Sequence, residues 1–362
     1  MAWTVSWKVF VDGQDMTDGM RPFLTGITVS DKDGTASDTC SLDFDDAGGQ
    51  LRLPQDGARV QVFLQAVQIF EGTVDSVRSS GSRGGGRTLQ VSAKGFDAKG
   101  KVKEPQSHHM DDATLQQFLD KAAGNAGLTM VVDPAFAEIK RDYWAADASS
   151  FLHLGQKLAR ELGGTFKIRG DKAVLAKRGT GESAAGGAMP TVIGRIPGNV
   201  ISWDITPLTT RRTFKSGVAR FFDRSSASFK SVSVDTEVEG AQAINEIRTA
   251  AADEAQAQGM AEGRKSDSKR EGGEGGVELD LEVTARAEGT FILSGARPGV
   301  DGSYRIAGVT HKADRGGGST TSLELKQPES GAGKDDRKPT AASGSGNAEA
   351  AEFALPTHET LG

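Results

Sequence analysis

The stretch that decides the fold is Gly302–Lys326, which reads GSYRIAGVTHKADRGGGSTTSLELK. Two runs of alternating hydrophobic residues flank a glycine-rich turn, which is typical of a β-hairpin. The alternation of the first run resumes one residue late and predicts a β-bulge at Ala307-Gly308. A lone hairpin is marginal in water, so this one needs partner strands. The residues that define it are Tyr304, Ile306, His311, Leu323 and Leu325.

Composition points to a chain of several β-rich units. At about 100–150 residues per domain, 362 residues predict two or three domains. The 47 glycines lack a Gly-X-Y period and indicate many turns and linkers. The net charge of −6 argues against bulk electrostatic binding of nucleic acid. The single cysteine, Cys40, excludes an internal disulfide and lies in an alternating run as a small buried residue.

The first part of the chain, residues 1–107, is expected to be a β domain. About six alternating runs are separated by turn-forming Asp-Gly and Gly-Gly pairs, which favours an antiparallel sandwich or barrel. No signal peptide or membrane-spanning run is present, so we expect a soluble protein made in the cytoplasm without stable membrane binding. The runs begin at Trp3 and continue at 27–29, 40–44, 60–64, 69–77 and 89–93.

Residues 108–178 are expected to form a small α+β domain with an internal repeat. Hydrophobic residues from Leu115 to Ala126 recur at helical spacing after a cap region at Asp112 and Thr114, and Gly127 ends the helix. The same helix-glycine-strand unit returns 36 positions later, with Ser150 and Gly163 at its ends. Two such units are too few for a solenoid and predict a compact pair.

The remaining chain returns to β patterning after a linker at 179–190. Residues 191–327 predict a second β domain of about six strands, including runs at 213–222 and 229–234, interrupted by an inserted helix at 240–262. A polar, glycine-rich stretch is expected at 263–276. Residues 328–362 are too poor in large apolar groups to fold alone and predict a flexible tail. A small apolar cluster in it resembles a docking peptide for a partner protein: Phe353, Leu355 and Pro356.

No group of residues predicts catalysis, a cofactor site or a metal site. His108-His109 with Asp111-Asp112 has metal-ligating side chains, but neighbouring residues project differently and the segment precedes a helix cap, so a solvated loop is favoured. His153 and His311 are interpreted as structural or surface histidines. Nucleophile-elbow, P-loop and zinc-protease motifs are missing from the sequence.

Glycine-rich and basic stretches are also interpreted as structural. The glycines of Ser82–Arg87 and Gly316–Gly318 do not precede a helix, so hairpin tips are favoured over phosphate-binding loops. Arg211-Arg212 and the basic run Arg264–Arg270 have acidic or polar neighbours and predict solvated faces. The missing catalytic motifs make an enzyme less expected, although two carboxylates that are distant in the sequence can still form a catalytic pair in the folded protein.

Several features together resemble the late-control D proteins of contractile-tailed phages, relatives of the baseplate hub and of the N-terminal part of VgrG spike proteins. The middle region shows the family's paired helices, at Thr114-Leu115 to Gly127-Leu128 and at Ser150-Phe151 to Leu162-Gly163, with Tyr143-Trp144 between them. The last domain shows its Gly-x-Tyr-x-Ile-x-x-Val-x-His pattern from Gly302 to His311. The resemblance spans about residues 1–327, and only the polar stretch near Arg264–Gly276 departs from it.

This resemblance implies a structural baseplate hub. Three chains, each with two β-barrel tube domains, would place six barrels in a ring and adapt the hexameric tail tube to the trimeric central spike. The implied partners are a homotrimer, the tail tube, spike and tape-measure proteins and other baseplate proteins, with DNA only in transit through the lumen. The implied location is the virion tail baseplate, assembled in the bacterial host cytoplasm. The alternatives are a tail-associated cell-wall hydrolase or glycan-binding protein, and the hub of a secretion-type contractile injection system.

Overall fold

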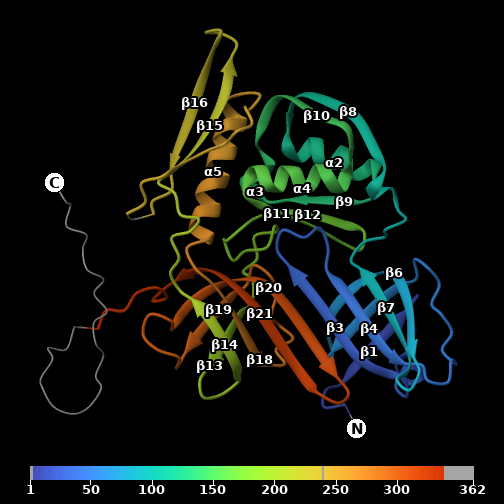
Figure 1. The fold of residues 1–362 in the computed structure, drawn as a ribbon. Coiled ribbons are helices and arrows are strands. Elements are labelled where there is room, and N and C mark those ends of the chain that lie inside the picture. Colours follow the sequence, from blue (N-terminus) through green and yellow to red (C-terminus); the bar gives the residue numbers. More distant parts are fainter. Residues whose placement is uncertain (1–2, 239, 338–362) are drawn as a thin grey trace, which may run out of the picture.

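The computed structural model describes residues 3–238 and 240–337. Figure 1 shows two β units side by side in the lower half of the molecule and two smaller units above them. One of the smaller units is the α+β unit, and the other is a hairpin packed on a long helix. Each of the four units has its own hydrophobic core. The protein is mainly β with an α+β insert, as the sequence predicts.

The first β unit is an antiparallel sheet whose alternating residues bury one face. Its core contains the expected alternating runs, including Cys40, Leu42 and Phe44. Trp3, where a strand was expected to begin, lies before the first strand and packs edge-on against Trp7, with ring centroids 5.4 Å apart. The elements are β1 (Trp7–Val11), β2 (Gln14–Asp15), α1 (Thr17–Met20), β3 (Leu24–Lys32), β4 (Thr39–Asp45), β5 (Arg59–Leu64), β6 (Val67–Ser82) and β7 (Gly86–Lys94).

The second β unit is built around the hairpin predicted at Gly302–Lys326. Its register shifts between Ile306 and Gly308, which confirms the predicted bulge. The other strands of this unit come from segments before and after a long helix, as expected. The elements are β13 (Thr191–Arg195), β14 (Val200–Thr206), β18 (Glu274–Asp280), β19 (Thr290–Ser294), β20 (Gly302–Asp314) and β21 (Gly318–Glu329).

The two β units are joined in one 13-stranded sheet. β3 of the first unit pairs antiparallel with β20 of the second, from Gly26 opposite Asp314 to Lys32 opposite Gly308. Ala313 of the second unit contributes to the core of the first. The continuous sheet therefore contributes to two separate hydrophobic cores, one in each β unit. Closure of each unit into a separate barrel stays a prediction.

The α+β unit contains both predicted helix-glycine-strand repeats. Thr114 caps the first helix and forms a capping box with Gln117, and Ser150 caps the second. Gly127 and Gly163 follow the two helices with positive φ angles of 75° and 66°. The elements are η1 (Lys101–Lys103), β8 (Pro105–Thr114), α2 (Leu115–Asn125), β9 (Thr129–Val132), α3 (Pro134–Ala137), β10 (Lys140–Ser150), α4 (Phe151–Leu162), β11 (Gly164–Arg169) and β12 (Lys172–Lys177).

The segment around His108-His109 is a strand, so the prediction of a solvated loop is wrong. β8 pairs with β10, with His109 opposite Ala145. The ring of His108 lies 5.4 Å from that of Phe118, on the side of β8 that faces the core. β8 and β10 form a two-stranded sheet that is exposed on its other face, so β8 is mostly polar. Its alternation of core-facing and exposed residues therefore cannot be recognised from hydrophobicity.

The inserted helix lies later in the chain than predicted. It is α5 (Glu254–Arg270) rather than 240–262, and it includes much of the stretch expected to be an irregular polar loop. The side chain of Asp253 caps it by accepting a hydrogen bond from the Gln256 amide at 2.7 Å. Ala257 and Ala261 face its core. Ile244 and Ile247 lie three residues apart, as on one face of a helix, but both precede α5, so this spacing does not mark helical structure here.

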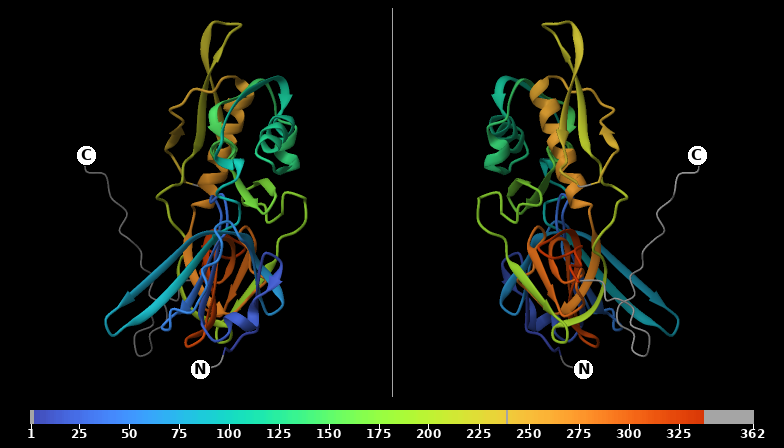
Figure 2. Two further views of the ribbon diagram at one scale, coloured as in Figure 1. Left: turned by 90° about the vertical axis from the view of Figure 1, so that its right-hand side faces the viewer. Right: turned by 90° about the vertical axis from the view of Figure 1, so that its left-hand side faces the viewer.

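Two strands expected in the second β unit belong to the α5 unit instead. β15 (Ser216–Asp223) and β16 (Ser228–Asp235) form a three-stranded sheet with β17 (Ile244–Glu246) and pack on α5. Figure 2 shows that this hairpin projects beyond α5 at one end of the molecule, whereas the β6–β7 hairpin projects from the other end. The expected linker, 179–190, contains one isolated bridge between Glu182 and Ala188.

Candidate assembly surfaces

The five residues that define the hairpin are buried side chains rather than surface residues. Tyr304, Ile306, Leu323 and Leu325 lie in the core of the second β unit. The Tyr304 hydroxyl donates a hydrogen bond to the carbonyl of Val300 at 2.6 Å, and burial raises the pKa of Tyr304 to about 12. These residues hold the β unit together and are not themselves available to a partner.

His311 is a neutral, structural histidine near the seam between the β units. Its side chain is 3% exposed, and Nδ1 lies 3.1 Å from Oγ1 of Thr321. Burial, and then the charge of Arg286, lower the pKa of His311 to about 4, while the Ala285 backbone and Glu282 act in the opposite direction. The group therefore contributes to folding in its neutral form.

The burial of His311 predicts a loss of stability in acid. Because its folded pKa lies below the ordinary value of 6.5, the contribution is complete above pH 6.5 and is lost as the pH falls toward 4, by about 3 kcal/mol in total. Urea unfolding of the protein and of His311→Gln at pH 7 and pH 4.5 measures this. The variant should lose about 2 kcal/mol less than the unchanged protein between these pH values. Equal losses would contradict the prediction.

A buried ionic cluster joins the first β unit to the α+β unit. Lys167 on β11 contacts Asp31 and Asp38, at 2.8 Å from the latter, and Arg169 also pairs with Asp38. Burial and the neighbouring Asp38 raise the pKa of Asp31. Burial opposes ionisation of Asp38 as well, but Lys167 and Arg169 hold its pKa below the ordinary value. The cluster fixes the α+β unit on the sheet.

A second buried cluster joins α5 to both β units. Arg270 at the end of α5 is 4% exposed and pairs with Asp33 and, at 3.2 Å, with Glu288. Burial raises the pKa of Glu288, although Arg270 acts against this shift. The expectation that the whole run Arg264–Arg270 is solvated is therefore wrong at its last residue. The sequence offers no signal for it because the partners lie far apart in the chain.

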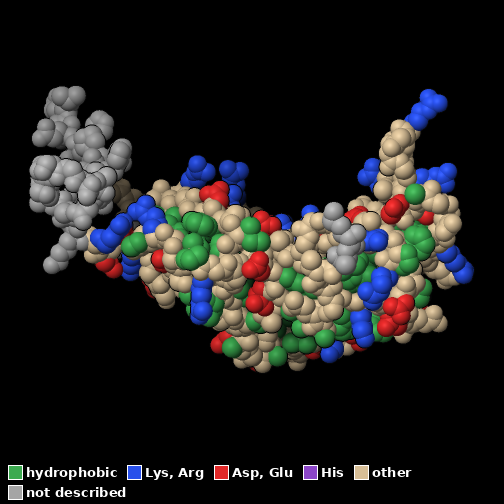
Figure 3. All heavy atoms as spheres, turned by 90° about the horizontal axis from the view of Figure 1, so that it is seen from below, with side chains coloured by type: hydrophobic (Ala, Val, Ile, Leu, Met, Phe, Trp, Pro, Cys, Tyr) green, Lys and Arg blue, Asp and Glu red, His purple; other side chains and the backbone are tan. Residues whose placement is uncertain are grey.

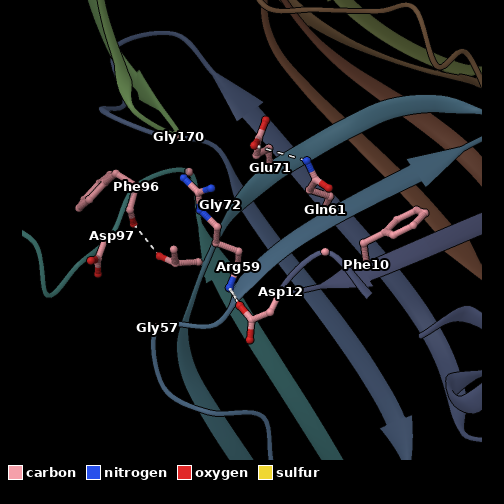
Figure 4. Close-up of a pocket in the computed structure, with 13 residues that line it drawn as sticks. Phe10, Asp12, Gly57, Arg59, Gln61, Glu71, Gly72, Phe96, Asp97 and Gly170 are labelled. Carbon is pink, nitrogen blue, oxygen red and sulfur yellow. Dashed lines mark hydrogen bonds between the residues drawn. The ribbon is translucent and has the colours of Figure 1, made fainter. Parts of the chain in front are cut away.

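The pocket in Figure 4 lies between the first β unit and the turn that joins β11 to β12. Its polar groups mostly bond to one another: the Arg59 amide donates to Asp12 Oδ1 at 2.8 Å, and Gln61 Nε2 donates to Glu71 Oε1 at 3.4 Å. In residues 3–238 and 240–337, no group of three His, Cys, Asp or Glu side chains is arranged to hold a metal ion. The same described part contains no helix long and apolar enough to span a membrane.

Exposed hydrophobic side chains gather on the outer strands of the second β unit. Ile193 on β13 and Ile292 on β19 are direct cross-strand partners, and both are exposed. β14 is the terminal strand of the large sheet, and its Trp203 is 45% exposed. Such an edge, with unpaired backbone groups and apolar side chains, is suited to contact with another protein chain. Trp203 pairs with the core residue Val277, so it lies on the core side of the sheet at this open edge, whereas Ile193 and Ile292 face outward. We call these three residues, on the two faces of the edge, the β13–β14 surface.

A second exposed cluster lies at the tip of the β15–β16 hairpin. Phe222 and Phe229 face each other across the hairpin with ring centroids 5.3 Å apart and are 43% and 67% exposed. The lower face of the β units, seen in Figure 3, mixes hydrophobic and charged side chains without one dominant patch. Sequence alternation missed both apolar clusters because it does not reveal which strand face remains uncovered. Phe353, Leu355 and Pro356 lie outside the described residues.

The chain is similar in sequence to phage baseplate hub proteins. No protein-family model matches the chain. Over 194 residues the chain is 26% identical to the probable baseplate hub protein of Escherichia phage P2, covering 52% of this chain and 49% of that protein. It is 24% identical over 190 residues to the probable baseplate hub protein of Escherichia phage 186, covering 51% and 48%. The matches span about half the length of these curated relatives.

The fold is shared with solved phage tail proteins. The 43 kDa tail protein of prophage MuSo2 from Shewanella oneidensis superposes with a TM-score of 0.65 at 14% identity, covering 89% of this chain and 98% of that one. An Escherichia coli component of the type VI secretion system superposes with a TM-score of 0.55 at 11% identity, covering 91% and 79%. The chain thus has a phage-tail type of fold. With the curated relatives, this confirms the predicted resemblance to the baseplate hub family.

Proposed function

We propose that the chain is the baseplate hub of a contractile, phage-like tail and is located in the tail baseplate. The observation that carries this proposal is the sequence similarity to the probable hub proteins of phages P2 and 186, combined with a fold shared with a prophage tail protein. The role is structural rather than catalytic. A zymogram on peptidoglycan tests this part of the proposal, because clearing by the purified protein would favour a cell-wall hydrolase.

The hub acts as a homotrimer that changes the symmetry of the tail. Two β units per chain give six units in a trimer, so one side matches the hexameric tail tube and the other matches the threefold central spike. The joined sheet and the buried Arg270 cluster support this role because they hold the two β units in a fixed relation. The ring encloses the passage for DNA and tape-measure protein, and other baseplate proteins bind around it.

The proposed trimer places the β13–β14 surface in contacts between subunits. An obligate interface buries roughly 2,000 Å² or more and has an apolar centre, which this surface supplies. The double variant Ile193→Asp/Trp203→Ser should therefore convert the trimer to monomers, because each lost central contact costs about 2 kcal/mol or more. Light scattering after size-exclusion chromatography measures the mass, and circular dichroism checks the fold.

The matched control for this experiment is Leu53→Asp, a change of another exposed hydrophobic residue in the first β unit. It should leave the trimer unchanged. A folded double variant that remains trimeric would exclude the β13–β14 surface as the subunit contact. Unchanged protein that stays monomeric and binds neither tube nor spike protein would reject the hub itself.

The fold shared with a type VI secretion component favours one alternative, the hub of a secretion-type contractile system. The curated relatives are phage proteins, and this favours the phage-type tail. Pull-down with the tube and spike proteins encoded beside the gene distinguishes the two. Retention of phage-type partners supports the first role, and retention of secretion-type partners supports the second.

A further inference from the structure

A cleft with an apolar floor separates the α+β unit from α5. It has a volume of about 610 Å³. Phe136, Ile139 and Leu162 line one wall, and Ala255 and Gly259 of α5 line the other. The two walls meet where α4 ends against α5. A Cβ atom on Gly263 would lie 2.8 Å from the carbonyl oxygen of Glu161, so the contact requires glycine.

The rim of the cleft carries lysines that lack an acidic partner. Lys140, Lys177 and Lys269 are exposed, and none forms an ion pair with the residues that the structure describes. The other cations of the cleft are paired: Lys265 with Glu237 at 2.6 Å, and Arg178 with Asp267 at 3.5 Å. Glu262 is the one carboxylate among the described lining residues. In a chain of net charge −6, this is a locally positive site. It suits a ligand that carries both carboxylates and apolar side chains.

We propose that the cleft binds the C-terminal segment 348–361 of the same chain. Its sequence, AEAAEFALPTHETL, combines three carboxylates with Phe353, Leu355 and Leu361 and contains no lysine or arginine. Its carboxylates, Glu349, Glu352 and Glu359, complement the lysine rim, and its apolar side chains fit the floor.

The chain can deliver this segment to the cleft. Gln327, at the end of β21, itself lines the cleft, and the described chain continues from it to Arg337. The stretch from Arg337 to Glu349 can span up to ~40 Å, at ~3.3–3.6 Å per residue. This proposal does not depend on the assembly role, and it gives the apolar cluster at Phe353–Pro356 a binding site on the chain itself.

Hydrogen exchange of the full-length protein tests the proposal. The amides of residues 349–355 should be protected at least ~10-fold, which corresponds to about 1.4 kcal/mol of binding. The variant Lys140→Glu/Lys177→Glu/Lys269→Glu should remove this protection by like-charge repulsion. The variant Glu349→Lys/Glu352→Lys/Glu359→Lys should also remove it, and combining the six changes should restore it because the charges are then exchanged.

The control changes three exposed lysines of the α+β unit that do not line the cleft: Lys101→Glu/Lys103→Glu/Lys172→Glu. This control changes the net charge by the same amount as the cleft variant, and it should preserve the protection of residues 349–355. Unprotected exchange of this segment in the unchanged protein overturns the proposal. A loss of protection in the control as large as that in the cleft variant also overturns it. Protection that appears only as the protein concentration rises also overturns it, because a second copy then supplies the segment.

Discussion

Replacing Lys167 with methionine is expected to lower the free energy of unfolding by about 3–5 kcal/mol. The side chain is buried between Asp31 and Asp38, and methionine fills its volume without its charge. Two carboxylates would then remain in the junction with Arg169 alone, which pairs with Asp38 and is half-exposed. Urea unfolding followed by circular dichroism measures the change, and limited proteolysis shows whether the α+β unit is released first.

Lys172→Met is the matched control because Lys172 is exposed on the adjacent strand β12. It should change the free energy of unfolding by no more than about 0.5 kcal/mol. The triple variant Lys167→Met/Asp31→Asn/Asp38→Asn should recover part of the loss, because no unpaired carboxylate is then buried. If Lys167→Met is as stable as Lys172→Met, the cluster does not hold the two units together.

The features that sequence predicted well are those determined by neighbouring residues. The helix-glycine-strand repeat was readable because each helix carries its own start signal, at Thr114 and Ser150, and its own glycine stop. The bulge in the hairpin was readable because one extra residue shifts every later side chain to the other face. Both signals act within about ten residues and need no knowledge of the rest of the fold.

The features that sequence missed depend on contacts between distant segments. α5 is rich in good helix formers, but the glycines Gly259 and Gly263 and the lack of a clear apolar stripe hid its extent. It forms because Ala257 and Ala261 pack against the β15–β16 hairpin and because Gly263 permits close contact with α4. The pairing of β3 with β20 likewise joins strands from opposite ends of the chain.

The candidate surfaces were also hidden from the sequence. Ile193 and Ile292 alternate with buried neighbours in the same way as core residues, and only the structure shows that their outward face is uncovered. The lysines of the cleft lie on β10, β12 and α5, and separately each resembles an ordinary solvated residue. A surface of this kind is a property of how units pack, so no local pattern can reveal it.

Leu323→Asp is expected to unfold the second β unit. Leu323 is 1% exposed and lies in the core beside Val309, its cross-strand partner on β20. The change creates a cavity and buries a carboxylate without a partner, which together cost about 5 kcal/mol or more. Formation of the proposed trimer should be lost with it, but as a consequence of unfolding, since Leu323 is inaccessible to a neighbouring chain. Circular dichroism and limited proteolysis of the purified variant measure the loss.

Ser322→Asp provides the control because this neighbouring residue points to the exposed face of the same strand. It should retain the fold and change the free energy of unfolding by about 0.5 kcal/mol or less. The difference between adjacent positions follows from the alternation of β21, whose residues face the core and solvent in turn. A folded Leu323→Asp variant that fails only to form trimers would show that this face of β21 meets another subunit and would exclude the packing described above.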